Sequence, residues 1–600
     1  MCGIVGYLGE KKATDVILSG LEKLEYRGYD SCGVSFYAAE SNEFITYKDK
    51  GRVNHLVQDF NYQKNNHLGI GHTRWATHGK PNQINSHPHF SKSERFYLVH
   101  NGVIENYKEL TAKYLPEVTF VSETDSEIVA NLIEHFSNTL SVEEAIRKTL
   151  SLIEGSYALL IVDTTNPNAL YAAKNKSPML IGIGKGGITL ASDVMALVGF
   201  AESYFPIEDK TFTSVYKTPK GEYEFSLVDI IGKPVHYEFK KIDMVLEEIG
   251  KGGYSHFMLK EICEQPSVIR KIVSKYLEND TFFISPTILS MFKDIDRIYI
   301  IAAGTSMHAG FVGKFLFEKM PKIPCEVFIA SEFAYNPPLL VERPLFIFIS
   351  QSGETADLRA CLLNVKQKGY KTLTITNVPT STLAREADHY LEIYAGPEIA
   401  VASTKAYVGQ ICILTILSYT LTVRKPFDLQ MELSKVAISM EAIIDNREYI
   451  HQIVQEKITK RNCFYIGRGI DYFTCLEAAL KLKEISYIQT EGFAAGELKH
   501  GTIALIEEGV PVIAIISQSS INNNTRSNIR EVTARGANKC VISLNSVSDV
   551  TDEIVLMDVH EYLTPLVTVI PTQLIAFYSA LDLHKDIDKP RNLAKSVTVE

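Results

Sequence analysis

The sequence predicts an α+β layered domain followed by two doubly wound α/β sandwiches, and two observations support this fold class. Up to about residue 240, short apolar segments alternate with Gly, Asn and Pro, which is typical of sheets covered by helices. Beyond that point, the segment Arg297–Gly304 recurs 165 residues later as Asn462–Gly469. A repeat of this length indicates two copies of one domain rather than a solenoid.

Composition narrows the function classes. The 600 residues carry a net charge of −10 without a long basic run, which argues against nucleic acid as a partner. No stretch reaches the roughly 18 apolar residues of a membrane span, and the N-terminus lacks the pattern of a secretory signal. Nine cysteines without CxxC pairing suggest a reducing compartment. We therefore expect a soluble, cytoplasmic protein that has neither a membrane nor a nucleic acid as its partner.

A cysteine directly follows the initiator methionine, in Met1-Cys2-Gly3. If Met1 is removed, Cys2 carries a thiol nucleophile and a free amine, whose reference pKa is about 7.7–8.0, on one Cα. This is a self-contained form of the nucleophile–base pair of catalytic triads. By itself, a chance cysteine at the chain terminus explains the observation equally well.

Within the first 240 residues we expect helices over 15–25 and 127–136 and strands over 33–37 and 96–100. The segment Gly182–Gly187 matches the dinucleotide-binding pattern GxGxxG. A strand-like rather than a helical sequence follows it, which favours a hairpin turn over a nucleotide site.

Several polar residues of this region have types suited to substrate binding. Arg74 could hold a carboxylate, and Asp125, near a helix start, could hold an ammonium group. Asn101 and Gly102 follow an expected strand and could donate to an oxyanion. Ordinary turns at strand ends explain each of these residues equally well when it is taken alone. Five histidines between His72 and His100 lack metal-ligand spacing, so we expect no metal.

The motifs CGIVGY, LEYRGYDSCG, HTRWATHG, SHPH, VHNGVIENY and SETDSE resemble the glutaminase domain of the N-terminal-nucleophile amidotransferases. The resemblance implies an αββα sandwich in which Cys2, after loss of Met1, attacks the side-chain amide of glutamine. Arg74 and Asp125 would bind the α-carboxylate and α-amino groups, and Asn101 and Gly102 would form the oxyanion hole. The resemblance also places further residues in or near the pocket: Trp75, which would gate an internal channel, Thr77, His78 and His87.

In the duplicated half, the loop Ser350-Gln351-Ser352-Gly353-Glu354-Thr355 follows a buried strand and opens a helix at Ala356. Hydroxyl groups and free N–H groups at a helix start can cradle a phosphate, and Thr305 and Ser306 offer two more hydroxyls. Simple helix capping is the alternative. No GxxxxGK[ST] loop is present, so a nucleoside triphosphate site is not expected. The second copy, Ser517–Asn522, lacks the glycine and the threonine, so we expect it to be mainly structural.

A helix is also expected over 476–487, and its residues Glu477, Lys481 and Glu484 share one face. A surface ion-pair ladder would explain this spacing as well as a site would. A polar loop ending in Lys499-His500 follows this helix. The C-terminal tail, 590–600, alternates apolar residues, so we expect it to pack against the protein.

The motifs AGTS, SQSGETAD, PEIAVASTKAY, ALKLKEISYI, EGFAAGELKHG and PRNLAKSVTVE are similar to the sugar-isomerase (SIS) domains of the glucosamine-6-phosphate synthase family. The resemblance implies that Lys595 forms a Schiff base with the ketose and that Glu484 moves a proton between the first two sugar carbons. His500 of a neighbouring subunit would open the sugar ring, so a homodimer is expected. The implied sugar-phosphate-binding residues are Thr305, Ser306, Ser350, Gln351, Ser352, Thr355, Val401 and Lys481.

Together the two resemblances cover essentially the whole chain. They imply an aminotransferase that converts glutamine and fructose 6-phosphate into glutamate and glucosamine 6-phosphate, as the first step of amino-sugar biosynthesis, without cofactor or metal. The expected domains are 1–240 for the glutaminase, 241–255 for a linker, 256–450 for the first SIS domain, and 451–600 for the second SIS domain with the tail. Ala303 and Thr502 depart from the family pattern without touching a proposed catalytic atom.

Two alternatives remain. Another amidotransferase with the same N-terminal half should show a nucleotide loop of the SGGxDS type or an acidic diphosphate loop, and neither occurs in the sequence. A non-enzymatic sugar-phosphate sensor should have lost Cys2, Glu484, His500 or Lys595, and all four are present.

Overall fold

The structure is a computed structural model that describes residues 2–59, 65–75, 80–242 and 250–597. The chain divides into two compact units, one that reaches to Gly250 and one that spans Lys251–Lys595. The linker predicted over 241–255 lies partly outside the described residues, since 243–249 are not among them. Its first residue belongs to a short strand, β14 (Lys240–Lys241), which pairs with β11 (Ser203–Pro206) of the first unit.

The first unit contains two largely antiparallel sheets. In the order of their hydrogen bonding, the described strands of one sheet are β14, β11, β9 (Leu180–Gly184), β10 (Gly187–Ala191), β1 (Gly3–Gly9), β4 (Leu68–Arg74), β2 (Ser31–Ala38) and β3 (Glu43–Asp49). Those of the other are β13 (Tyr223–Asp229), β12 (Thr211–Lys217), β8 (Ala169–Asn175), β7 (Gly155–Asp163), β6 (Phe96–Ile104) and β5 (His89–Phe90). The core between them is apolar, with Ile4 and Ile70 facing Val99 and Leu160.

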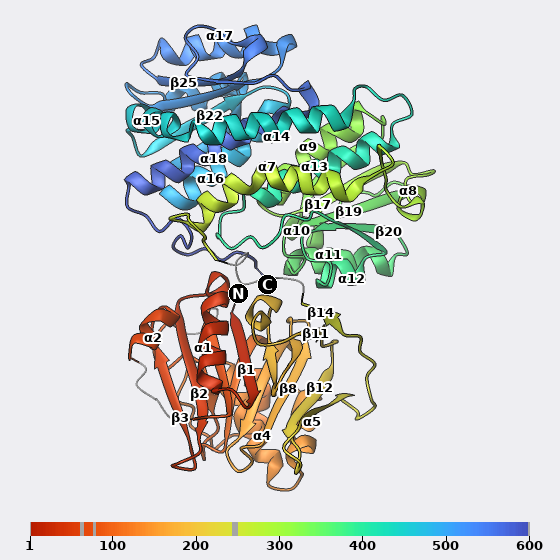
Figure 1. The fold of residues 1–600 in the computed structure, drawn as a ribbon, viewed down its shortest axis with the longest axis vertical. Helices are drawn as coiled ribbons and strands as arrows, with labels where there is room; N and C mark the ends of the chain where they lie inside the picture. The colour runs from red at the N-terminus through yellow and green to blue at the C-terminus, as the bar shows by residue number, and fades with distance from the viewer. Residues whose placement is uncertain (1, 60–64, 76–79, 243–249, 598–600) are drawn as a thin grey trace. The chain divides into compact units, whose positions relative to one another are not determined.

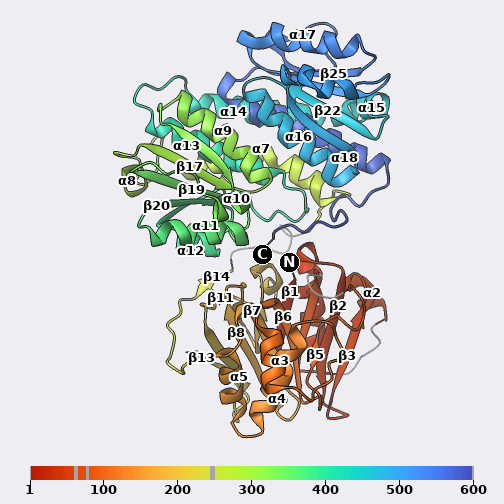
Figure 2. The same ribbon diagram turned by 180° about the vertical axis from the view of Figure 1, so that it is seen from behind.

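Helices cover the outer faces of both sheets. Helix α1 (Ala13–Leu24) lies in front of the first sheet in Figure 1, and α3 (Tyr107–Tyr114), α4 (Ser126–Ser137) and α5 (Val142–Leu150) lie in front of the second in Figure 2. The arrangement is therefore the predicted αββα sandwich. Helices α1 and α4 confirm the two predicted helices: the buried residues of α1 follow the helical spacing seen in the sequence, and α4 begins directly after the polar entry at 122–125.

The glycine-rich segment at 182–187 is confirmed as a hairpin. Strands β9 and β10 pair in antiparallel register, with Gly184 opposite Gly187, and Gly186 in the turn has φ of +74°. Such a φ is readily adopted only by glycine, which explains the residue type without a nucleotide.

One strand prediction was too short. Residues 100–102, which the sequence places after a strand, lie inside β6 and pair with β7, with Gly102 opposite Tyr157. Gly102 has φ of +137°, and a Cβ at this position would lie 1.9 Å from the backbone oxygen of Ser156. The strand therefore continues past the polar residues, and glycine is required where it does so.

The second unit contains two parallel five-stranded sheets of identical topology, counted over the described residues. The first sheet is ordered β18 (Cys325–Ile329), β17 (Arg297–Ala302), β19 (Pro344–Ser350), β20 (Lys371–Thr376) and β21 (His389–Glu392). The second is ordered β23 (Gln489–Ala494), β22 (Asn462–Gly467), β24 (Pro511–Ile516), β25 (Asn538–Leu544) and β26 (Ile554–Leu556). Both orders are the doubly wound 2-1-3-4-5 pattern, so the predicted duplication is confirmed.

Helices cover both faces of each sheet (Figure 1). On the first sheet, α7 (Phe257–Tyr276), α9 (Thr305–Lys319) and α13 (Lys405–Leu421) contact one face, and α10 (Ala330–Tyr335), α11 (Ala356–Gln367) and α12 (Thr382–Glu386) contact the other. The remaining helices of this unit include α8 (Pro286–Ser290), α14 (Leu429–Asp445), α15 (Arg447–Lys457), α16 (Ile470–Ser486), α17 (Asn522–Thr533) and α18 (Thr564–Asp582). Two-sided burial explains the continuous apolar strand sequences.

Helix α16 begins at Ile470, six residues before the predicted start. Its N-cap, Gly469, has φ of +56° and ψ of −127°, nearly the values of Gly304 before α9, which are +55° and −131°. The same glycine turn therefore joins the first strand to the first helix in both copies.

Among the described residues, one helix is long and apolar enough to cross a membrane by length and composition alone, over Glu561–Asp582. All of its apolar window is buried within the protein. It packs in the centre of the second unit, as a core helix of a globular domain does.

Candidate active sites

The predicted nucleophile, Cys2, lies at the start of the central strand β1 and is partly buried. The backbone N–H of Trp75 donates to its Sγ at 3.1 Å. Burial raises the pKa of the Cys2 thiol, whereas the hydrogen bond from Trp75 and the charge of Arg74 act in the opposite direction. An N–H donor aimed at the sulfur stabilises a thiolate, which is the form that attacks a carbonyl carbon.

Asn101 comes from β6 of the second sheet and reaches the same place. Its Nδ2 donates to the backbone oxygen of Cys2 at 2.9 Å, which sets the amide directly beside the nucleophilic residue. Gly102 follows Asn101 in the strand. The structure therefore brings the two proposed oxyanion-hole residues to Cys2 from a different sheet.

Behind Asn101 lies a buried group of three imidazole rings, of which the family resemblance placed only His87 near the pocket. His72 and His87 have ring centroids 4.1 Å apart, and His87 and His89 have centroids 4.4 Å apart. Burial lowers the pKa of His72 to about 3 and those of His87 and His89 well below the ordinary value. The rings are therefore neutral. No group of three or more metal-ligating side chains lies close enough to hold a metal among the described residues.

Arg74 and Asp125 are both buried at the edge of this site. Burial lowers the pKa of Arg74, and the nearby Cys2, Asp30 and Asp125 offset part of that effect. The Oδ2 of Asp125 accepts from the backbone N–H of Ile104 at 2.6 Å, just before α4. The proximity of the two charges is consistent with the binding of a zwitterionic amino acid. Two other predicted residues of this pocket, Thr77 and His78, lie outside the described residues.

In the second unit, the predicted phosphate loop lies at the carboxyl end of β19, beside the turn that follows β17. This is the point where the strand order reverses, the usual ligand position in such sheets. Ser350 Oγ is 3.1 Å from Thr355 Oγ1 and accepts from the Gly353 N–H at 3.0 Å. Thr355 is the N-cap of α11 but makes no side-chain capping bond. Helix capping therefore does not explain why a residue with a hydroxyl group occupies this position.

The other predicted phosphate ligands surround this loop. Ser306 Oγ accepts from Gln410 at 2.9 Å, and Ser352 Oγ accepts from the Glu354 N–H at 3.2 Å. The backbone oxygen of Gln351 accepts from Asn377 at 3.1 Å, and Val401 is buried with its N–H on the oxygen of Asp588 at 3.0 Å. Gln351 and Val401 therefore help to hold the loop and the tail in place through their backbones.

The shared face of α16 is buried, which rules out a surface ion-pair ladder. The Lys481 side chain is 1% exposed, and its Nζ lies 2.6 Å from Glu484 and 3.5 Å from Glu477. Burial alone would lower the pKa of Lys481, but these two carboxylates raise it overall. Lys483, on the opposite side of the helix, is exposed.

Glu477 links this helix to the first copy. It accepts from Thr305 Oγ1 at 3.1 Å, and its Oε2 lies 2.7 Å from His308 Nδ1. The Glu477 side chain is fully buried. Glu477 lies on the helix face that the sequence predicts. Its partners, however, are about 170 residues away in the sequence, and no local pattern points to them.

The part of the C-terminal tail up to Lys595 packs within the second unit, in line with the expected packing of the tail. Arg591 donates its N–H to Tyr487 Oη at 2.8 Å and its guanidinium lies over the Tyr487 ring. Four residues later, Lys595 is buried, and its Nζ contacts Glu398 at 2.5 Å and Ser403 at 3.1 Å. Glu398 is a residue that the sequence analysis missed.

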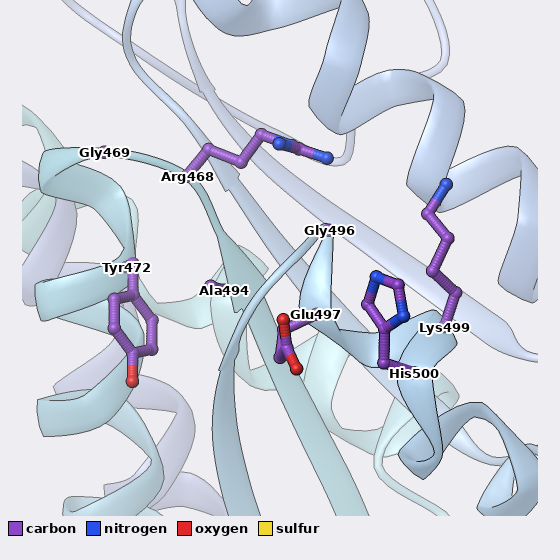
Figure 3. A pocket seen from close by; sticks show the side chains of 8 residues that line it. All are labelled: Arg468, Gly469, Tyr472, Ala494, Gly496, Glu497, Lys499 and His500. Atoms are coloured by element: carbon purple, nitrogen blue, oxygen red, sulfur yellow. The ribbon is translucent and has the colours of Figure 1, made fainter.

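His500 is separated from these groups. It is exposed in the turn η3 (Glu497–His500), and in the described part of the chain no hydrogen bond or ion pair joins it to Lys481, Glu484 or Lys595. His500 follows β23 and lines a pocket of about 530 Å³ at the ends of β22 and β23. Arg468, which follows β22, lines the same pocket (Figure 3). The structure therefore places Cys2 in the first unit and Glu484 and Lys595 in the second. His500, the fourth predicted catalytic residue, lies apart from them.

The second copy has a carboxylate where the first has a phosphate-loop hydroxyl. Asp471 stands 165 residues after Ser306 and receives hydrogen bonds from the N–H of Ser517, at 2.9 Å, and from its Oγ. Ser517 directly follows β24 and matches Ser350, the last residue of the corresponding strand β19. Burial raises the pKa of Asp471 to about 6. An internal carboxylate at the anion position explains why this copy should not bind phosphate.

Comparison with known proteins finds the domains that the resemblance implies in both halves of the chain. Residues 72–199 match the glutamine amidotransferase domain, and residues 291–418 and 458–582 match the SIS domain. A protein named glutamine--fructose-6-phosphate aminotransferase [isomerizing] from Listeria monocytogenes is 54% identical over the full length of both chains. One of the same name from Bacillus thuringiensis is 53% identical, again over both full lengths.

Among solved structures, the second half of the chain is similar to the C-terminal domain of glucosamine-fructose-6-phosphate aminotransferase from Francisella tularensis. The TM-score is 0.53 at 35% sequence identity, and the match covers 56% of this chain and 99% of that one. The similarity therefore extends over nearly all of the solved domain.

Proposed function

The chain belongs to the glutamine--fructose-6-phosphate aminotransferase (isomerizing) family, and we propose which of its residues carry out the two half-reactions. The enzyme hydrolyses glutamine and uses the ammonia to convert fructose 6-phosphate into glucosamine 6-phosphate. The assignment of residues rests on the hydrogen bonds in each unit. In the first unit, Trp75 and Asn101 both donate to Cys2. In the second unit, Lys481 pairs with Glu484, and the hydroxyl groups of the Ser350 loop lie together.

In the glutaminase site, Cys2 Sγ attacks the amide carbon of glutamine, and Asn101 Nδ2 and the Gly102 N–H stabilise the oxygen that becomes negative. Arg74 binds the α-carboxylate and Asp125 the α-ammonium group. Trp75 lies beside the nucleophile, with its N–H on Cys2 Sγ. Loss of Met1 frees the α-amine of Cys2, which takes the thiol proton and passes it to the departing ammonia.

In the isomerase site, the phosphate of fructose 6-phosphate binds the hydroxyl groups of Ser306, Ser350, Ser352 and Thr355, with Thr305 and the backbones of Gln351 and Val401 beside them. Lys595 forms a Schiff base with the ketose carbonyl. Glu484 removes a proton from one of the first two carbons and returns it to the other. Lys481, 2.6 Å from Glu484, holds this carboxylate in place.

The isolated position of His500 supports a homodimer. In the described part of the chain, no hydrogen bond or ion pair holds this exposed imidazole at Lys481, Glu484 or Lys595, so it is available to the site of a second copy. We assign ring opening to His500 in this arrangement. The nine free cysteines support a cytoplasmic location, where thiols remain reduced.

The test is an assay for glucosamine 6-phosphate with glutamine and fructose 6-phosphate, run on two variants in parallel. Cys2→Ala should abolish glutamine hydrolysis while fructose 6-phosphate still binds. Lys595→Ala should abolish borohydride trapping of the sugar while basal glutamine hydrolysis continues. Trapping at another lysine, or hydrolysis without Cys2, would contradict the assignment.

Two controls accompany this test. Cys32→Ala removes a buried thiol from strand β2 of the same sheet and should leave glutamine hydrolysis unchanged. The intact mass of the purified wild-type protein should correspond to the chain without Met1, because a retained methionine would block the amine of Cys2.

A further inference from the structure

An ion pair joins the C-terminal tail to the first SIS copy inside the second unit. Lys595 Nζ donates to Glu398 Oε2 at 2.5 Å, across 197 residues of sequence, and the two side chains are 2% and 0% exposed. Removing two charges from water costs several kcal/mol for each ion, so such a pair is stable only where further hydrogen bonds satisfy it. The surroundings of Glu398 provide them.

The carboxylate of Glu398 is fixed by the chain segment that follows it. Oε1 accepts from the N–H groups of Thr404 and Ala406, at 2.9 and 3.0 Å, and Oε2 accepts from Ser403 Oγ at 3.0 Å. Burial alone would raise the pKa of Glu398, but the Lys595 ammonium and these hydrogen bonds lower it to about 2. Glu398 therefore remains ionised and oriented at neutral pH.

The other lysines near Glu398 have carboxylate partners of their own. Lys405 on α13 directs its Nζ to Glu264 at 2.6 Å, and Lys481 on α16 directs its Nζ to Glu484. The hydrogen-bonded partner of Glu398 among these lysines is therefore Lys595.

A second acidic group, Glu261 on α7, also faces this cluster. Its Oε1 accepts from the N–H groups of Ile399 and Ala400, at 2.5 and 3.1 Å. Burial and the charge of Glu398 raise the pKa of Glu261 to about 8, which leaves it largely neutral at pH 7. The charged carboxylate at Lys595 is thus Glu398.

We propose that Glu398 is a positioning residue for the Schiff-base step, which holds Lys595 Nζ in place and acts as its counter-ion throughout the reaction. The inference rests on the proposed role of Lys595. It extends the site to Glu398, which lies in the segment between β21 and α13, 197 residues before Lys595 in the sequence.

The chemistry balances with Glu398 in this role. The Lys595 ammonium releases one proton to water, and the resulting amine attacks the ketose carbonyl carbon to form a carbinolamine. A proton from water then passes to the carbinolamine hydroxyl, which leaves as water, and a C=N bond forms, while Glu398 stays ionised beside the nitrogen. The nitrogen carries one positive charge before and after the step, so a fixed carboxylate beside it stabilises both states. The charged C=N group also makes the neighbouring C–H more acidic for Glu484.

The test is borohydride trapping of fructose 6-phosphate on the full-length enzyme, with the adduct located by mass spectrometry and its rate measured against pH. Glu398→Gln should slow adduct formation at Lys595 at least about 100-fold, with the KM for the sugar within about threefold of wild type. The pH profile of the remaining trapping should move down by at least about one unit, since a neutral amide no longer favours the ammonium form.

Glu398→Asp keeps the charge but shortens the side chain, so it should slow trapping roughly tenfold without moving the pH profile. This variant decides the question if Glu398→Gln fails to fold. The matched control is Glu264→Gln, which removes the carboxylate of another lysine in the same cluster and should trap at the wild-type rate.

Trapping at wild-type rate and pH profile in both Glu398 variants would overturn the inference. The result would remain distinguishable from a failure of the proposed function. If Lys595→Ala still traps the sugar, the role of Lys595 is wrong; if Lys595→Ala loses the adduct while the Glu398 variants keep it, only the role of Glu398 is wrong.

Discussion

The Nε2 atom of His72 lies 3.0 Å from the Oδ1 atom of Asn101 and 3.0 Å from the backbone oxygen of His100. Both partners are acceptors, so Nε2 must carry the proton. The same contact fixes the amide of Asn101, because only Oδ1 can face an N–H donor while Nδ2 faces Cys2. Since burial lowers the pKa of His72 to about 3, this tautomer persists at all pH values where the enzyme works.

We therefore predict that His72→Leu lowers kcat for glutamine hydrolysis by about 10- to 100-fold and leaves KM nearly unchanged. The donor itself remains, but its orientation is no longer fixed, so the loss should not exceed that for removing one oxyanion donor, about 10²–10³. Steady-state glutaminase kinetics measure both constants.

The control for this prediction is His89→Leu, a neighbouring buried imidazole that contacts Thr124 rather than Asn101. It should retain most of the activity. In a double-mutant cycle, adding His72→Leu to Asn101→Ala should cost little more than Asn101→Ala alone. Fully additive losses would show that His72 does not act through Asn101.

Gly353 in the phosphate loop should not tolerate a side chain. It has φ of +66°, and a Cβ would lie 1.9 Å from Ser381 Oγ. We predict that Gly353→Ala raises the KM for fructose 6-phosphate at least about tenfold, because the loop must shift to relieve both the strain and the clash. Gly369→Ala is the matched control, since its φ is +76° with open space around it. Equal effects of the two changes would contradict the prediction.

Glu484→Gln should separate proton transfer from Schiff-base formation. An amide cannot accept the proton, so exchange of the hydrogens on the first two carbons of fructose 6-phosphate with D2O should slow at least about 100-fold. Trapping of the sugar at Lys595 should persist. NMR of the sugar recovered from D2O measures the exchange. Glu491→Gln, an exposed carboxylate on β23, is the control; retained exchange in Glu484→Gln would move the role of the base elsewhere.

Asp471→Asn should stabilise the second copy in a pH-dependent manner. Burial raises the pKa of the folded-state carboxyl to about 6, so the folded state holds the proton more tightly than the unfolded state. Below about pH 4 the carboxyl is neutral in both states and costs nothing. Between about pH 4 and 6 the unfolded carboxyl loses its proton while the folded one keeps it, so the wild type loses stability over this window, and the shift of about two units corresponds to roughly 3 kcal/mol once the pH exceeds 6.

Thermal unfolding from pH 4 to pH 7 measures this effect. The gap between Asp471→Asn and wild type should widen over the range in favour of the variant, because asparagine can still bond to Ser517. Asp549→Asn is the control, since hydrogen bonds from Thr551 lower the pKa of this exposed carboxyl and its removal should not stabilise the protein. A gap that stays constant with pH would contradict the prediction.

The sequence by itself determined the domain classes, the duplication and most of the proposed site residues. Helix α1 was predictable because its buried residues repeat with the helical period, and α4 was predictable because a polar, acidic entry precedes it; both signals are local. The two copies were predictable because the strand β17 and its counterpart β22 have similar apolar sequences and lead into the same glycine turn. The motifs carried the family resemblance because each lies on one continuous segment.

Only the tertiary structure decided which side chains meet. The pairs His72–Asn101, Thr305–Glu477 and Glu398–Lys595 join residues that are 29, 172 and 197 positions apart, and no periodicity or motif links their members. The structure also decided that the charged face of α16 is buried rather than exposed, because α16 packs in the interior of the second unit. Local sequence patterns record backbone preference and burial, whereas contacts between distant segments depend on how whole elements pack.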